Sequence, residues 1–177
     1  LVKPPVRRAL LRSLTTGGDA EKVGASLTGV TLRLVVMLAL LKAAVLVGAV
    51  ELPLPPLFVH SEGGLLGLVA DPDAAVNGYF YTCMSVAKST GKASDVQVWK
   101  WQLTSDTTAV KVKTLVKGIP IGHGRHNGCR LRFRSGDLLY IGTGDAAKGT
   151  NPQNLKSLGG KVLRVHSDGT IPRSNPY

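Results

Sequence analysis

The chain has 177 residues, the size of one domain, and 44% of them are hydrophobic, which is enough to bury a core and excludes a disordered tail. Its formal net charge is +11, from 22 basic and 11 acidic side chains, a balance that suits nucleic acid or an anionic surface. The basic residues are scattered, however, and aromatic residues make up only 5%, so the pattern argues against nucleic-acid binding.

Residues 1–50 form an atypical N-terminal segment. Val6 to Leu14 has helical spacing with a basic face, and residues 34–50 are the most apolar run of the chain. Basic residues before this run, and the small residues Val47 to Ala49 near its end, are typical of an export signal or a membrane anchor. Lys42 inside the run, and a length below the ~20 residues of a membrane span, favour instead a buried helix or a pair of strands.

The regularly patterned part of the chain, residues 51–177, begins with a proline-rich stretch. Three prolines between Glu51 and Pro56 exclude a helix and a central strand there. Short apolar or alternating segments then follow, separated by Gly, Asp and Asn turn residues, which predicts an all-β fold. Residues 71–78 and 104–108 read as turns, and Val110 to Val116 as a strand with one wet face, because apolar residues alternate with Lys. The strands are expected within 61–70, at 79–84, 96–103, 110–116, 159–165 and in a hairpin centred on 136.

That hairpin is bracketed by two groups capable of proton chemistry. Its strands alternate Leu131 and Phe133, then Leu139 and Ile141, with polar or small residues, and the turn between them contains Ser-Gly-Asp. His126 precedes the first strand and Asp145 follows the second. Antiparallel pairing returns the chain to its starting end, so we expect the two side chains to meet, with the carboxylate orienting the imidazole. A turn cap is the other role open to Asp145.

A sequence pattern similar to that of the hairpin occurs earlier in the chain. Residues 67–81 and 130–140 both run as a strand, an Asp or Gly turn, and a strand that carries Tyr. Short strands repeated in this way, here at ~60 residues, are typical of propeller blades. Two unrelated hairpins would give the same pattern.

Two cysteines, Cys83 and Cys129, both fall on predicted strands, and their spacing fits no zinc motif. In an exported protein they could form one disulfide that closes a loop of ~45 residues. Two buried free thiols are the alternative.

A series of short motifs runs in fixed order through residues 58–177. They are Glu62-Gly-Gly-Leu-Leu-Gly67, Asp71-Pro-Asp73, Tyr79-Phe-Tyr81, His126-Asn-Gly-Cys-Arg-Leu131, Ile141-Gly-Thr-Gly-Asp145, Asn151-Pro-Gln-Asn154, Gly160-Lys-Val-Leu-Arg-Val165, Asp168-Gly-Thr-Ile-Pro172 and Asn175-Pro176. This series resembles the glucose/sorbosone dehydrogenase family, the soluble quinoprotein sugar dehydrogenases that use pyrroloquinoline quinone (PQQ). Residues 1–50 resemble the family poorly.

The resemblance implies a six-bladed β-propeller, of which this chain would form about two blades, with the quinone across the top face. It also implies oxidation of an aldose: a histidine takes the proton of the anomeric hydroxyl while hydride passes to PQQ. His126 matches this general base, Asp145 its carboxylate partner, and Glu62 a polar residue near cofactor and sugar.

Other polar residues receive lesser roles. The motif with Gln153 and Asn154 has no role that we can assign. Loop or surface positions are expected for His60, His123 and His166. Arg130, Arg132 and Arg134 share one strand face, for which we expect solvent exposure, and contact with an anionic ligand is the alternative.

The resemblance further implies calcium. The carbonyls that bind it, and most side chains that hold the quinone, would lie beyond Tyr177, so no metal ligand is predicted within this chain and we expect it to be incomplete as an enzyme. The family resemblance and residues 34–50 together predict an exported protein, in the periplasm, cell envelope or medium. A non-catalytic envelope propeller that binds carbohydrate or protein is the alternative function.

Overall fold

The computed structural model describes residues 33–34, 50–134 and 136–176. Most of the predicted N-terminal segment, including residues 35–49 of the apolar run, lies outside this range, so its three interpretations stay open. At its borders, β1 (Arg33–Leu34) pairs with β2 (Val50–Glu51) in an antiparallel two-stranded sheet.

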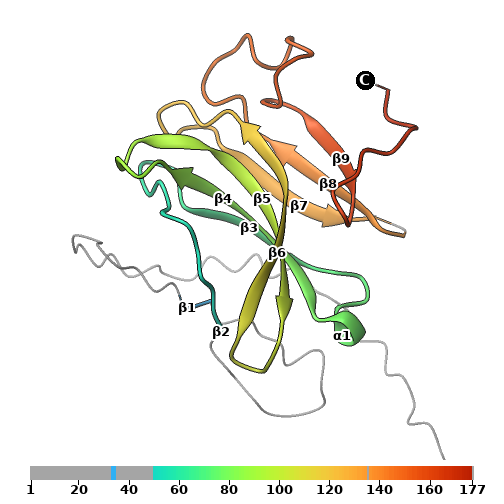
Figure 1. Ribbon diagram of the computed structural model, residues 1–177. Coiled ribbons are helices and arrows are strands. Elements are labelled where there is room, and N and C mark those ends of the chain that lie inside the picture. The colour runs from blue at the N-terminus through green and yellow to red at the C-terminus, as the bar shows by residue number, and fades with distance from the viewer. Residues whose placement is uncertain (1–32, 35–49, 135, 177) are drawn as a thin grey trace, which may run out of the picture.

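A four-stranded antiparallel sheet forms the first half of the described fold. Its order is β3-β4-β5-β6, and the strands follow one another along the chain (Figure 1). They are β3 (Leu65–Ala70), β4 (Tyr79–Ala87), β5 (Ala93–Leu103) and β6 (Ala109–Ile119), which matches the predicted strand series.

The connection between β3 and β4, predicted as a turn, contains the single-turn helix α1 (Ala74–Asn77). Gly78 ends this helix in the left-handed conformation, with φ +69°. Among the described residues, no helix has the length and apolar character needed to cross a bilayer.

The second sheet contains the predicted hairpin. It consists of β7 (Gly128–Phe133), β8 (Leu138–Thr143) and β9 (Val162–His166), antiparallel and in that order. Gly136 supplies the positive φ of the turn, at +77°. Gly128 pairs with Thr143, so the residue before β7 and the residue after β8 lie at the same end of the sheet.

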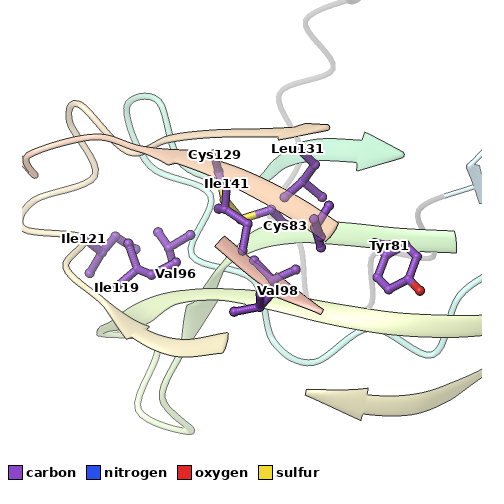
Figure 2. Packing of buried hydrophobic residues seen from close by; sticks show 11 residues of the cluster. Tyr81, Cys83, Val96, Val98, Ile119, Ile121, Cys129, Leu131 and Ile141 are labelled. Carbon is purple, nitrogen blue, oxygen red and sulfur yellow. A yellow bond between two sulfur atoms is a disulfide. The ribbon is translucent and has the colours of Figure 1, made fainter. Parts of the chain in front are cut away.

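The main core lies between the two sheets. β7 packs against β3 and β4, and side chains from the facing strands interdigitate (Figure 2). Cys83 of β4 and Cys129 of β7 form a disulfide inside this core, with no exposed surface and Cα atoms 6.1 Å apart. This settles the choice between a disulfide and free thiols. The buried residues are Tyr81, Cys83, Val96, Val98, Ile119, Ile121, Cys129, Leu131, Leu139, Ile141 and Val165.

The opposite face of the first sheet has an aromatic core of its own. Trp101 is fully buried and its indole N–H donates to the Thr82 hydroxyl at 2.8 Å. Residues 52–57 pack on this face, since Leu52 is buried in the cluster and Leu54 and Leu57 are partly buried against it. The proline-rich stretch therefore contributes apolar side chains to this second core.

The prediction of one wet face on β6 is wrong. Val110 and Val112 are 43% and 48% exposed, and the alternating lysines Lys111 and Lys113 are exposed as well. Two causes act together. β6 is the edge strand of its sheet, and three register shifts against β5 turn its side chains away from a simple alternation. The Lys111 ammonium lies over the Trp99 ring, with Nζ 3.2 Å from the ring centroid, so this side chain contacts an aromatic face of the sheet.

The disulfide should supply a large part of the stability of this two-sheet unit. It joins residues 46 positions apart, for which the chain-entropy model gives about 4 kcal/mol. We expect the double variant Cys83→Ala, Cys129→Ala to unfold at clearly lower urea concentration than the oxidised chain. A reductant should lower the midpoint of the wild type and leave that of the variant unchanged. Equal midpoints for the oxidised wild type and the variant would contradict this.

Candidate active site

Two loops meet at one end of the second sheet. The first precedes β7 and carries His126, and the second follows β8 and carries Asp145. Their backbones are joined where the Gly144 N–H donates to the Asn127 carbonyl at 3.0 Å and the Ala146 N–H donates to the His126 carbonyl at 3.2 Å. A Cβ atom at Gly144 would collide with the His126 carbonyl oxygen. The second glycine of the Gly-Thr-Gly-Asp motif, Gly144, is therefore required by the close contact of the two backbones.

Several non-glycine residues in these loops and at the start of β7 adopt left-handed backbone conformations. His126 has φ +54° and Cys129 has φ +80°, while Ala146 and Ala147 have φ +57° and +55°. Such conformations are uncommon for these residue types and persist only where the surroundings hold them. Here they are held by the contacts between the loops and, at Cys129, by the disulfide.

His126 and Asp145 meet as the hairpin geometry predicts. His126 Nδ1 lies 3.0 Å from Asp145 Oδ1, and the same oxygen accepts the Ala147 N–H at 2.9 Å. Asp145 thus fills both roles considered for it, partner of the histidine and cap of its own turn. The two side chains are 52% and 28% exposed, so the pair is open to a ligand from solution.

The pair has a defined protonation pattern. The hydrogen bond from His126, supported by the Ala147 N–H, holds the pKa of the Asp145 carboxyl below its usual value. An ionised carboxylate only accepts hydrogen bonds, so Nδ1 of His126 carries the proton in this contact. In the neutral imidazole, Nε2 is then left with its lone pair. A proton acceptor backed by a carboxylate is the arrangement of a general base.

Glu62 connects this pair to the first sheet. Its Oε2 accepts the His126 backbone N–H at 2.7 Å, and its own N–H donates to the Gly124 carbonyl at 3.0 Å. Glu62 lies in the segment before β3, so its two bonds tie the histidine loop to the neighbouring sheet. The structure therefore brings together the three predicted site residues. Asp145 contacts the imidazole of His126, and Glu62 contacts its backbone N–H.

Two asparagines of the site were not singled out from the sequence. Asn127 is 1% exposed and donates through Nδ2 to the Gly124 carbonyl at 2.9 Å, while its buried Oδ1 has no hydrogen-bond partner among the described residues. Asn151 donates through Nδ2 to the Asp145 carbonyl at 2.8 Å. In the sequence, Asn127 and Asn151 stood out only as members of the motifs at 126–131 and 151–154. Their hydrogen bonds depend on how the loops fold, which the sequence pattern does not reveal.

The remaining predicted residues lie away from the pair or at the surface. His60, His123, Gln153, Asn154 and the arginines 130, 132 and 134 are all exposed. His166 is half-buried and contacts Asp137 at 3.0 Å, at the opposite end of the second sheet. Within the described range, no cluster of three His, Cys, Asp or Glu side chains could hold a metal ion.

Comparison with known proteins places the fold. Residues 37–177 match the family model for glucose/sorbosone dehydrogenase. The chain belongs to the glucose/sorbosone dehydrogenase family. The matched range reaches further back than the resemblance seen in the sequence and includes most of the apolar run. The two packed sheets are accordingly two blades of a β-propeller.

Similar proteins of this family are sugar dehydrogenases. The aldose sugar dehydrogenase YliI of Escherichia coli is 32% identical over 125 residues, which are 70% of this chain and 33% of the relative. The PQQ-bound aldose sugar dehydrogenase of Streptomyces coelicolor is 32% identical, with a TM-score of 0.59 over 72% of this chain and 37% of that one. The soluble aldose sugar dehydrogenase of E. coli, in its apo form, is 31% identical, with a TM-score of 0.64 over 72% and 38%. The chain thus spans about a third of the length of the relative YliI.

The pairing can be tested by titrating the carboxylate. Because the hydrogen bond from His126 is the first cause of the low Asp145 pKa, His126→Ala should raise that pKa toward its usual value. The measurement is a pH titration of aspartate carboxyl carbons by NMR. Asp168 is the internal control, since its pKa is lowered chiefly by the Thr170 hydroxyl and should not move. An unchanged Asp145 titration would show that the contact is absent in solution.

Proposed function

We propose that this chain carries the proton-accepting part of a PQQ-dependent aldose dehydrogenase. The observation that supports this most directly is the contact of 3.0 Å between His126 Nδ1 and Asp145 Oδ1. Membership of the family and the PQQ-bound relative support the class of reaction and the cofactor. The substrate is an aldose that presents its anomeric hydroxyl.

The chemistry assigned to the chain is general-base catalysis. His126 Nε2 accepts the proton of the anomeric hydroxyl as the C–H hydride leaves the same carbon, which becomes a carbonyl. Asp145 keeps the imidazole oriented through Nδ1 and stabilises the positive charge that develops on it. When bound, PQQ supplies the electron-poor ring carbon that accepts the hydride.

The donor set fits such a site. The base is an exposed imidazole whose Nδ1 is already engaged, and the carboxylate behind it is kept ionised. Glu62 would stand near cofactor and sugar while fixing the His126 backbone. Calcium belongs to this proposal through the family resemblance alone. Full turnover is expected of a chain that includes all the blades of the family.

Export is part of the proposal. A fully buried disulfide between two blades suits an oxidising compartment such as the periplasm, the envelope or the medium. Residues 34–50 would provide the signal or anchor. We expect a fusion of residues 1–58 to an export-dependent reporter to be active outside the cytoplasm, and an inactive fusion would argue against this assignment.

A chimera tests the catalytic assignment. Residues 58–177 would replace the matching segment of the E. coli relative YliI, and sugar-dependent dye reduction would be measured with PQQ and calcium. We expect His126→Ala to lower kcat by roughly 10²–10⁴, the usual contribution of a general base. Asp145→Asn should lower it less and change the pH–rate profile, because the imidazole stays in place without its charged partner.

His123→Ala is the matched control, since this exposed histidine lies three positions away in the same loop and should leave kcat unchanged. Normal turnover after His126→Ala would rule out the assignment. A chimera that folds and binds PQQ but never oxidises sugar would favour the non-catalytic binding propeller.

A further inference from the structure

Lys161 is held in an unusual way at the start of the last strand. Its ammonium donates to the carbonyl oxygens of Asn151, Pro152 and Gly159, at 2.8, 3.0 and 3.0 Å. A lysine ammonium has three donors, so all three are used. The ammonium thus occupies the centre of a set of converging backbone carbonyls, as a bound metal cation would.

These carbonyls belong to both arms of the long loop between β8 and β9. Asn151 and Pro152 lie on the outgoing arm, and Gly159 lies on the returning arm. The neck of the loop is closed by backbone bonds: the Thr143 N–H donates to the Lys161 carbonyl at 2.8 Å, and the Gly160 N–H donates to the Gly144 carbonyl at 2.8 Å. The side chain of Lys161 therefore folds back into its own loop and joins the two arms.

The outgoing arm carries the contact to Asp145. Asn151 has its backbone carbonyl on the Lys161 ammonium and its side-chain amide on the Asp145 carbonyl, at 2.8 Å. The residue is 9% exposed, so little water competes for these bonds. Lys161 and Asp145 are thus linked through a single residue, Asn151, whose amide holds the backbone of the residue whose carboxylate contacts His126.

We propose that Lys161 is a positioning residue, which fixes Asn151 and through it keeps the Asp145 carboxylate against His126. Its importance for catalysis rests on the function proposed above, but its effect on the pair does not. The geometry also speaks against the other obvious role for a lysine beside such a site, a contact with an anionic ligand, because its three donors point to the protein backbone. The residue acts by holding the loop and not by touching substrate.

The test compares two lysines of the same region. Lys161→Met removes the three N–H donors of the ammonium and keeps most of the side-chain volume. Lys156→Met is the control, because it changes an exposed lysine of the same loop. Aspartate carboxyl titrations by NMR, on this chain without cofactor, report on the pair directly. We expect Lys161→Met to raise the Asp145 pKa toward its usual value and Lys156→Met to leave it as in the wild type. A folded Lys161→Met protein with an unchanged Asp145 titration would overturn the proposal.

A second variant covers the case in which Lys161→Met does not fold. Asn151→Ala leaves its own backbone carbonyl available to Lys161 but removes the amide that holds Asp145. It should reproduce the rise in the Asp145 pKa, with Asp168 again unmoved as internal control. An unchanged Asp145 titration in folded Asn151→Ala would overturn the proposed path. Since no sugar or quinone is present, these outcomes are separate from success or failure of the chimera.

Discussion

The antiparallel pairing of β7 with β8 is the constraint on which the site depends. It returns the chain to the end of the sheet where it started, and the contact between Gly144 and the His126 backbone then sets the separation of the two loops. A side chain at position 144 would push the loops apart, and the bond between imidazole and carboxylate would be lost with it. The antiparallel strand pairing and the glycine at the loop contact thus together bring His126 and Asp145 into contact.

The position of His126 also depends on the neighbouring blade. Glu62 holds the histidine backbone from the segment before β3, and the disulfide holds Cys129 from β4 (Figure 2). Both attachments lie within three residues of His126 in the chain. The left-handed backbone at His126 and Cys129 is costly in isolation, and these links to a second sheet compensate for it. The candidate base is therefore placed by the packing of two blades and not by its own hairpin alone.

The sequence was informative where structure follows from local pattern. Alternation and turn residues predicted the strands and the hairpin, and strand direction predicted that His126 would meet Asp145. The alternation failed on β6, where Val110 and Val112 are exposed because an edge strand with register shifts does not bury one face. The roles of Lys161 and Asn151 could not be predicted, because they arise from carbonyls and amides that converge only when a long loop folds.

A second histidine–aspartate pair shows why chemistry alone does not identify the site. His166 Nδ1 lies 3.0 Å from both carboxylate oxygens of Asp137, a contact as short as that of His126. That pair joins the turn before β8 to the end of β9, within one blade. At His126, Asn151 of the long loop holds the backbone carbonyl of Asp145, the Ala147 N–H holds its carboxylate, and Glu62 of the other blade holds the His126 backbone. Orientation from several independent elements is what a general base needs, so the fold favours His126 over an otherwise equivalent pair.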